Sequence, residues 1–234
     1  MNIILVPGLW LDGSTWNKVT PALETAGHRT HALTPPGMES KDADRSGVTR
    51  QDHVEAVVAA IDSADSDRVV LVGHSAGAAI AYAAVDARPD RVARAIFISG
   101  FPLGDGEADP GGFSSHDGEI PFPEWSDFDE DDLADLDEAM LARFREQAIP
   151  SPAGAALEPQ RLSDERRYDV PVTMICNEFS SEVLRSWIER DLSPVREFTR
   201  IKDVTYVDLP TGHWPQFTRP EELARLLLDA AARG

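Results

Sequence analysis

The sequence predicts a single α/β domain built on a largely parallel sheet with crossover helices. Short apolar runs alternate along the chain with segments of helical periodicity, and this alternation is typical of βαβ units. A length of 234 residues suits one such domain. The composition, 42% hydrophobic and 27% charged, is that of a globular protein.

Six apolar runs are predicted to be strands. Most are rich in β-branched residues and end at glycine, proline or a polar residue, which favours strands over helices. The predicted strands are Ile3–Val6, His28–Leu33, Arg68–Val72, Val92–Ser99, Val170–Cys176 and Val204–Leu209.

Helical spacing between these runs predicts the covering helices. Val54, Val57 and Ile61 share one face of such a helix. Gly27 is expected to end the first helix, and Pro89 ends an alanine-rich one. The predicted helices are Thr15–Ala26, Thr49–Asp62, the alanine-rich segment after Gly77, Leu133–Gln147 and Glu221–Ala231.

Residues 101–169 differ in composition from the rest of the chain. Glycine, proline and acidic residues dominate this interval up to Asp132, and one helix and another Pro/Gly-rich stretch follow. We interpret the interval as a small cap insertion within a single domain, residues 1–234. Its acidic run, Asp127–Asp132, is expected to be a solvated helix start and not a metal site.

Charge excludes two classes of partner. The chain has 41 acidic and 22 basic residues, a formal net charge of −19 that repels nucleic-acid phosphate and anionic lipid. Its first apolar run is too short for a signal peptide, and no stretch reaches membrane-spanning length. We therefore expect a cytoplasmic protein that binds neither nucleic acid nor membrane. The oligomeric state does not follow from these features.

A G-x-S-x-G motif, Gly73-His74-Ser75-Ala76-Gly77, lies between a predicted strand and a predicted helix. In this motif the serine occupies a tight strand-to-helix turn and projects its hydroxyl above the sheet. Small flanking residues let the strand and helix backbones approach without a Cβ clash. Ser75 is therefore the predicted nucleophile.

A serine hydroxyl needs a base, and the base needs an orienting acid. His213 follows the last predicted strand, which is where the base of such a triad is expected after Ser and acid in chain order. His74, inside the motif, is expected to pack or to support the site. The other histidines, on an early strand, a surface helix and in the cap, are His28, His31, His53 and His116.

At these residues the chain resembles the α/β-hydrolase superfamily, and within it bacterial relatives of plant methylesterases and hydroxynitrile lyases. The resemblance is carried by four segments of the predicted core, which are Leu5–Trp10 with Gly13 and Trp16, Leu23–His28, Ala95–Pro102 and His213–Leu223. It implies an α/β-hydrolase fold, with a mostly parallel sheet flanked by helices, and catalysis without metal or organic cofactor.

The resemblance also implies an oxyanion hole formed by two backbone N–H groups. One is that of Ala76, next to the nucleophile, and the other is that of Leu9, in the loop after the first strand. Relatives often have histidine in this loop where the present chain has Pro7.

The same likeness places the acid just after the strand that ends at Cys176. Relatives usually have aspartate at the position of Phe179, whereas the nearest carboxylate here is Glu178. Glutamate is one methylene longer and can reach the same imidazole, so Glu178 is the predicted acid. Glu182 and Asp208 are the alternatives. Cys176 itself is expected to be a small core residue.

Together these features predict a serine hydrolase that cleaves small carboxylic esters through an acyl-enzyme. Trp10, Phe101 and Trp125 are the predicted substrate-binding residues, with Phe113 and Phe122 as further candidates for an apolar pocket under the cap. An acidic cap would disfavour strongly anionic esters.

Three alternatives stay open. Hydroxynitrile lyases of this family use a cap lysine, and this chain has no lysine between Lys41 and Lys202. Perhydrolysis is a side activity that the same site could support. The third alternative is a non-catalytic ligand-binding protein, since some hydrolase-fold proteins have become receptors.

Overall fold

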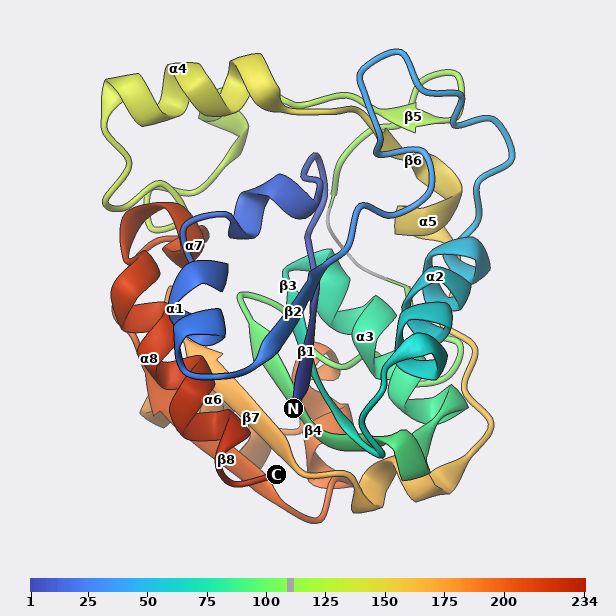
Figure 1. Cartoon of the computed structure of the whole chain (residues 1–234). Coiled ribbons are helices and arrows are strands. Elements are labelled where there is room, and N and C mark those ends of the chain that lie inside the picture. Colours follow the sequence, from blue (N-terminus) through green and yellow to red (C-terminus); the bar gives the residue numbers. More distant parts are fainter. Residues whose placement is uncertain (109–111) are drawn as a thin grey trace.

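One parallel sheet forms the centre of the molecule (Figure 1). The structure, a computed structural model, describes residues 1–108 and 112–234, so residues 109–111 of the predicted cap lie outside the described part. Within it the strand order is β2-β1-β3-β4-β7-β8, with every neighbouring pair parallel. The strands are β1 (Asn2–Val6), β2 (Arg29–Ala32), β3 (Val69–His74), β4 (Val92–Ile98), β7 (Val172–Cys176) and β8 (Val204–Asp208).

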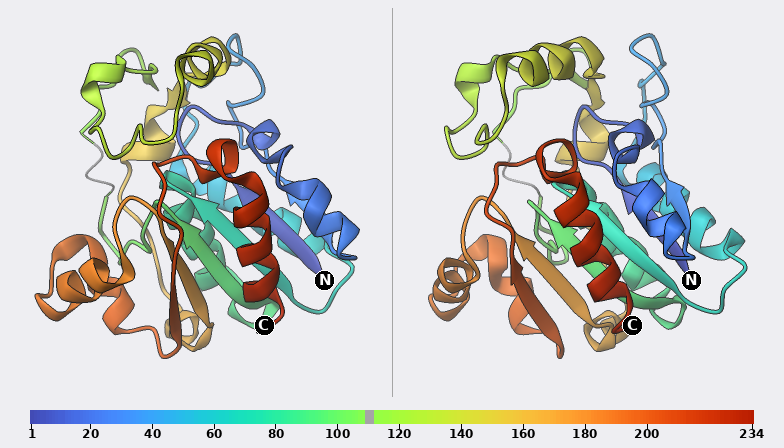
Figure 2. Two further views of the ribbon diagram at one scale, coloured as in Figure 1. Left: turned by 90° about the vertical axis from the view of Figure 1, so that its left-hand side faces the viewer. Right: turned by 60° about the vertical axis from the view of Figure 1, so that its left-hand side comes forward.

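Helices cover both faces of the sheet (Figure 2). The α-helices are α1 (Thr20–Thr25), α2 (Arg50–Ser63), α3 (Ala76–Ala87), α4 (Glu138–Gln147), α5 (Ala153–Leu157), α6 (Ser181–Glu189), α7 (Pro215–Thr218) and α8 (Pro220–Ala231). Short 3-10 helices are η1 (Gly13–Trp16), η2 (Pro89–Arg91), η3 (Trp125–Asp127), η4 (Glu165–Asp169) and η5 (Ser193–Thr199). No helix in these described residues is long and apolar enough to cross a membrane.

The core divides along the alternation of side chains in the strands. In β3, Leu71 packs on the side of α2, α3 and α6, whereas Val70 and Val72 pack on the side of α1 and α8. The same alternation separates Ile96 from Phe97 in β4. A sheet buried on both faces explains why its strands are continuous apolar runs in the sequence.

Because the strands are parallel, the loops that follow them meet at one edge of the sheet. The loops after β1, β3, β4, β7 and β8 carry Leu9, Ser75, Ser99, Glu178 and His213, in that order. The segment between β4 and β7 places α4 and the antiparallel pair β5 (Glu119–Ile120) and β6 (Ser151–Pro152) beyond this edge (Figure 1).

A third apolar cluster joins that segment to the core. Trp10, in the loop after β1, packs in it with Ile120 and Phe144 of the 101–169 segment and with Trp214 of the last loop. The indole N–H of Trp10 donates a hydrogen bond to the Ile120 carbonyl, at 3.2 Å. Residues from both ends of the chain therefore contact the segment that lies above the sheet.

Two predicted helices differ from those in the structure. The segment Thr15–Ala26 is not one helix: η1 ends at Trp16, and α1 starts at Thr20 with Pro21 in its first turn. The helix expected over Leu133–Gln147 begins only at Glu138, where the Asp137 carboxylate accepts the Met140 N–H. Pro21 and Asp137 mark where these helices begin, as a proline in the first turn and an N-cap residue, whereas the apolar spacing alone predicted longer helices.

Close packing at Gly77 is expected to make alanine destabilising there, although helix propensity alone favours alanine. Gly77 lies in α3, where alanine is favoured by about 1 kcal/mol. A Cβ at this position would lie 2.4 Å from the Pro7 carbonyl oxygen, a backbone atom of the neighbouring loop. We expect Gly77→Ala to lower the free energy of unfolding in urea by roughly 2 kcal/mol, because the loop must shift.

Ser186→Ala is the control, since Ser186 is an exposed position in α6. There we expect a gain of a few tenths of a kcal/mol, at most about 0.5, from propensity. A Gly77→Ala variant that is as stable as wild type, or more stable, would show that the loop yields to the added methyl group.

Candidate active site

Ser75 occupies the turn between β3 and α3 in a backbone conformation that is rare for a residue with a side chain. Its φ is 54° and its ψ is −130°. The Ser75 N–H donates to the Ile98 carbonyl at 2.8 Å, which ties the turn to β4. Left-handed backbone of this kind is costly, and it persists only where the surroundings determine it.

The backbone segments around Ser75 approach so closely that glycine is needed at three positions. A Cβ on Gly100 would lie 2.2 Å from the Ser75 carbonyl oxygen, and one on Gly8 would lie 2.7 Å from the Ser75 Cβ. A Cβ on Gly73 would lie 2.6 Å from the Ala78 Cα. The loops after β1 and β4 therefore close on Ser75 from both sides and hold the strained turn.

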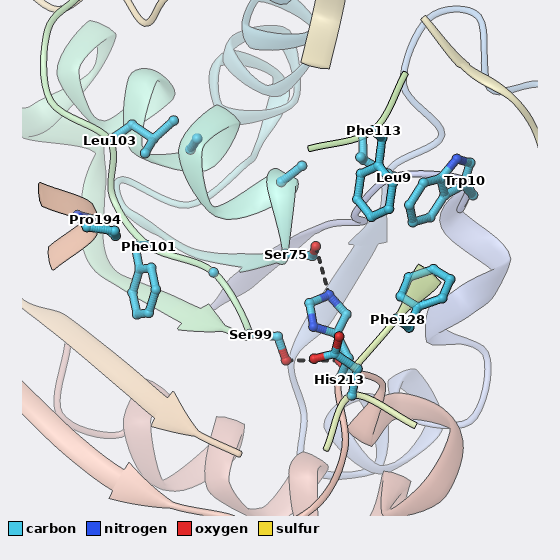
Figure 3. A pocket seen from close by; sticks show the side chains of 14 residues that line it. Leu9, Trp10, Ser75, Ser99, Phe101, Leu103, Phe113, Phe128, Pro194 and His213 are labelled. Carbon is cyan, nitrogen blue, oxygen red and sulfur yellow. Dashed lines mark hydrogen bonds between the residues drawn. The ribbon is translucent and has the colours of Figure 1, made fainter. Parts of the chain in front are cut away.

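The imidazole of His213 lies between Ser75 and Glu178. Its Nε2 is 2.9 Å from the Ser75 Oγ (Figure 3). Its Nδ1 contacts a carboxylate oxygen of Glu178. Glu178 is largely buried, with 13% of its side chain exposed, against 22% for His213. The structure thus brings together the serine, histidine and glutamate that the sequence singled out.

The alternative acids lie elsewhere. Glu182 is exposed in the first turn of α6. Asp208, at the end of β8, accepts hydrogen bonds from the backbone N–H and the hydroxyl of Ser181, at 2.6 and 2.9 Å. Phe179, at the position where the resemblance led us to expect an aspartate, packs its ring against Phe101 and Trp187 at centroid distances of 5.7 and 4.8 Å.

A buried polar network holds the backbone of His213. The His213 carbonyl accepts a hydrogen bond from His74 Nε2 at 2.8 Å and from the Ser99 hydroxyl at 2.9 Å. The Asn177 amide donates in turn to the Ser99 hydroxyl at 2.6 Å and to the Gly212 carbonyl at 2.8 Å. The loop that carries His213 is thereby fixed to the ends of β3, β4 and β7.

Burial keeps His74 neutral. Its side chain is fully buried, and this desolvation, aided by the charge of His213, lowers the pKa of His74 to about 3. A neutral imidazole that donates from Nε2 presents Nδ1 as an acceptor, 3.5 Å from the Gln216 amide nitrogen. From the sequence we expected a packing or supporting role for His74, and its hydrogen bond to the loop that carries His213 (the base loop) is of that kind.

The remaining histidines lie away from Ser75. His53 is buried, not on the surface as expected, because its Nε2 donates to the Pro36 carbonyl at 2.9 Å, and this burial lowers its pKa. His31 Nε2 lies 3.2 Å from the Asn2 side-chain oxygen. His116 is exposed and pairs through its backbone with Glu119. Cys176 is buried, which raises the pKa of its thiol to about 12 and makes it a poor nucleophile.

A cavity of about 370 Å³ opens above Ser75 and His213. Figure 3 shows Leu9, Trp10, Phe113 and Phe128 on one side of the Ser75–His213 pair, and Phe101, Leu103 and Pro194 on the other. Ala76 and Ser99 also line it. Of the predicted substrate-binding residues, Trp10 and Phe101 therefore face the cavity.

Trp125 does not line this cavity. Its ring packs among Phe122, Phe144 and Trp214, at centroid distances of 4.9, 5.6 and 6.3 Å, in the aromatic cluster behind it. Phe122 belongs to the same cluster. The sequence shows that this segment is aromatic but not which rings turn inward.

The position of Asp132 differs most from the one expected from the sequence. Instead of a solvated helix start, it lies in a turn that contacts the base loop: its carbonyl accepts the His213 N–H at 2.8 Å, and its side chain lines the cavity. One carboxylate oxygen each of Asp132 and Glu178 and a ring nitrogen of His213 lie within 4.8 Å of one another. A metal ion there would have to displace the contacts of His213 with Ser75 or Glu178.

Comparison with known proteins identifies the relatives of this chain. A family profile described as the alpha/beta hydrolase family matches residues 3–226. The chain is 25% identical over 252 residues to a pyrethroid hydrolase of Sphingobium wenxiniae, covering 98% of this chain and 87% of that one. It is 26% identical over 257 residues to methylesterase 7 of Arabidopsis thaliana, covering 97% and 95%.

Among solved structures, an extracellular alpha/beta-hydrolase from a Paenibacillus species superposes with a TM-score of 0.79, at 20% identity and 98% coverage of both chains. That likeness agrees with the parallel sheet and its flanking helices. The family profile spans nearly all of the sequence, including the serine turn and the histidine loop. The chain belongs to the alpha/beta hydrolase family, as a relative of its methylesterases.

Proposed function

We propose that this chain is a serine esterase that cleaves small carboxylic esters through an acyl-enzyme. The observation that carries the proposal is the chain of contacts from Ser75 through His213 to Glu178, which begins at the cavity. Ser75 Oγ lies 2.9 Å from His213 Nε2, and Glu178 contacts the opposite nitrogen of the same ring. The hydrolase and esterase names of the relatives support this class of reaction.

In the first half of the reaction, the Ser75 oxygen bonds to the ester carbonyl carbon while its proton passes to His213 Nε2. Glu178 holds the ring in the tautomer that accepts this proton and stabilises the imidazolium that forms. The C–O bond to the alcohol then breaks, and the imidazolium proton goes to the departing oxygen. In the second half, His213 takes a proton from a water molecule while the water oxygen bonds to the acyl carbon. The bond between that carbon and Ser75 Oγ then breaks, the imidazolium proton returns to the Ser75 oxygen, and the acid is released.

The negative charge that develops on the carbonyl oxygen in each half of the reaction must be stabilised by hydrogen-bond donors. Ala76 begins α3, and the first N–H groups of a helix have no partner within it. Leu9 also lines the cavity, and it lies in the loop after β1. This loop passes so close to Ser75 that a side chain at position 8 would clash with it. We assign the oxyanion hole to these two N–H groups, each worth roughly 10²–10³ in rate.

The cavity indicates the substrate class. Its two apolar sides flank Ser75, so both the acyl and the alcohol part of an ester can be held by apolar contact. Aromatic rings dominate one side, where Trp10 and Phe113 meet edge to face at 4.8 Å. Residues 101–169 provide Phe113 and Phe128, and we propose that this segment acts as the cap.

The alternatives of a cyanide-handling lyase and of a binding protein receive less support. None of the residues lining the cavity in the described part of the chain is a lysine. A binding protein has no use for a carboxylate seated on the histidine nitrogen that faces away from the ligand, and here Glu178 occupies that position.

The first test is turnover of p-nitrophenyl esters from acetate to octanoate by wild type and Ser75→Ala. We expect the wild type to release p-nitrophenol and the variant to lose at least about 10³-fold in kcat, because no covalent intermediate can form. A cavity of this size should favour short acyl chains. A Ser75→Ala variant that retains wild-type turnover would exclude the mechanism.

Glu178→Gln tests the acid. The amide keeps the shape of the side chain but no longer stabilises an imidazolium, so we expect kcat to fall by roughly 10²–10⁴ with the fold intact. Glu182→Gln, an exposed glutamate four residues later, is the matched control and should behave as wild type. Equal kinetics of the two variants would remove Glu178 from the triad.

Substrate charge provides a further prediction. A carboxylate, Asp132, lines the cavity, and the chain carries a strong net negative charge. We expect neutral esters to exceed matched carboxylated esters in kcat/KM by about tenfold at low salt, and added salt should narrow this gap. The same kcat/KM for both esters at low salt would contradict it.

A further inference from the structure

Asp132 comes to the reactive histidine from the cap, far in sequence from Glu178. It lies in the turn that precedes α4, and its carboxylate accepts the Asp129 N–H at 3.2 Å. Its carbonyl accepts the N–H of His213 at 2.8 Å. A Cβ on Gly212 would lie 2.5 Å from the same carbonyl, so the turn packs directly on the base loop.

The carboxylate of Asp132 faces the charges of the triad. One of its oxygens lies within 4.8 Å of both a Glu178 oxygen and a ring nitrogen of His213. Both ring nitrogens of His213 already have partners, Glu178 at Nδ1 and Ser75 at Nε2. Asp132 therefore acts on the imidazole chiefly through its charge.

A negative charge at this distance favours the imidazolium over the neutral ring. The imidazolium forms during both halves of ester hydrolysis and is absent from the resting triad. The attraction is thus greatest at the stage where it lowers a barrier.

Holding this carboxylate beside Glu178 has a cost. Partial burial raises the pKa of Asp132, and the charge of Glu178 raises it further, whereas the charge of His213 lowers it. Like charges so close together destabilise one another unless a cation lies between them. The arrangement is therefore most favourable when His213 is protonated.

We propose that Asp132 is a positioning residue for the esterase reaction, which supplies a second negative charge to the His213 imidazolium and fixes the cap on the base loop. The proposal rests on the proposed function of the same site. It makes the charge environment of the base depend on the cap as well as on the sheet.

The charges that face this pair come from several elements. In the described part of the chain, Asp132 faces His213, Glu178 and Asp129. His213 is also faced by His74 from the end of β3, with ring centroids 5.2 Å apart. Burial lowers the pKa of His74 to about 3, so its imidazole stays neutral and does not titrate near neutral pH.

The test is a direct titration of His213 by NMR in enzyme with ¹⁵N-labelled histidine. Wild type is compared with Asp132→Asn and with Asp131→Asn, an exposed acid one residue earlier in the same turn. We expect Asp132→Asn to lower the pKa of His213 by about one unit, because a neighbouring negative charge is lost. Asp131→Asn should leave it unchanged. The asparagine side chain can still accept the Asp129 N–H, so the turn is retained.

Activity provides the second readout. The base must be neutral to take the Ser75 proton, so a lower pKa of His213 moves the acid limb of kcat/KM to lower pH in Asp132→Asn by the same amount. Asp132→Asn should lower kcat about threefold in wild type but about tenfold or more in Glu178→Gln, where Asp132 is the remaining carboxylate at the ring.

The proposal is overturned if the pKa of His213 in Asp132→Asn equals that of wild type. It is also overturned if Asp132→Asn lowers kcat by the same factor with and without Glu178. Because the NMR titration needs no turnover, it separates the two proposals. An inactive wild type would count against the esterase function while the effect of Asp132 on the imidazole could still be measured.

Discussion

The strained backbone of Ser75 is the constraint on which the rest of the site depends. A left-handed serine between strand and helix is stable only if its neighbours leave it no alternative. Two loops do this by approaching Ser75 to distances that exclude a side chain, at Gly8 and Gly100, and α3 packs equally closely on the loop after β1 at Gly77. The two loops follow β1 and β4, which flank β3 in the sheet, so the parallel sheet itself aims the hydroxyl at the cavity.

The histidine is fixed by a different means. His213 lies on an irregular loop, and irregular backbone must find hydrogen bonds outside regular structure. Its carbonyl accepts hydrogen bonds from His74 and Ser99, and its N–H donates to the Asp132 carbonyl, so the His213 backbone is held by the strand ends and by the segment 101–169. Burial that keeps His74 neutral leaves the imidazolium of His213 without a second cation beside it.

Local sequence signals predicted the sheet, and they singled out three residues that the structure brings together, Ser75, His213 and Glu178. The strands were readable because burial on both faces makes them continuous apolar runs, and Ser75 because a strained turn requires glycines around it. Glu178 and His213 lie in the loops after β7 and β8, neighbouring parallel strands whose ends meet at one edge of the sheet. Ser99 and Asn177 carried the same signal, as polar residues at strand ends. Asp132 carried none, because its partners lie more than forty residues away in sequence. The inward or outward direction of Trp125 likewise depends on packing that no local pattern records.

The position of Asp132 also bears on how the proposed acid can be Glu178, one position before the residue where the family resemblance led us to expect an aspartate. Phe179 fills the expected position and packs with Phe101 and Trp187, which closes the end of β7 with apolar contacts. Glu178 then reaches the imidazole with a longer side chain that has more rotatable bonds to fix. In our proposal, a second carboxylate near the same ring makes the imidazolium less dependent on one geometry. Under this proposal, the segment 101–169 takes part in the charge balance of the base as well as in the shape of the pocket.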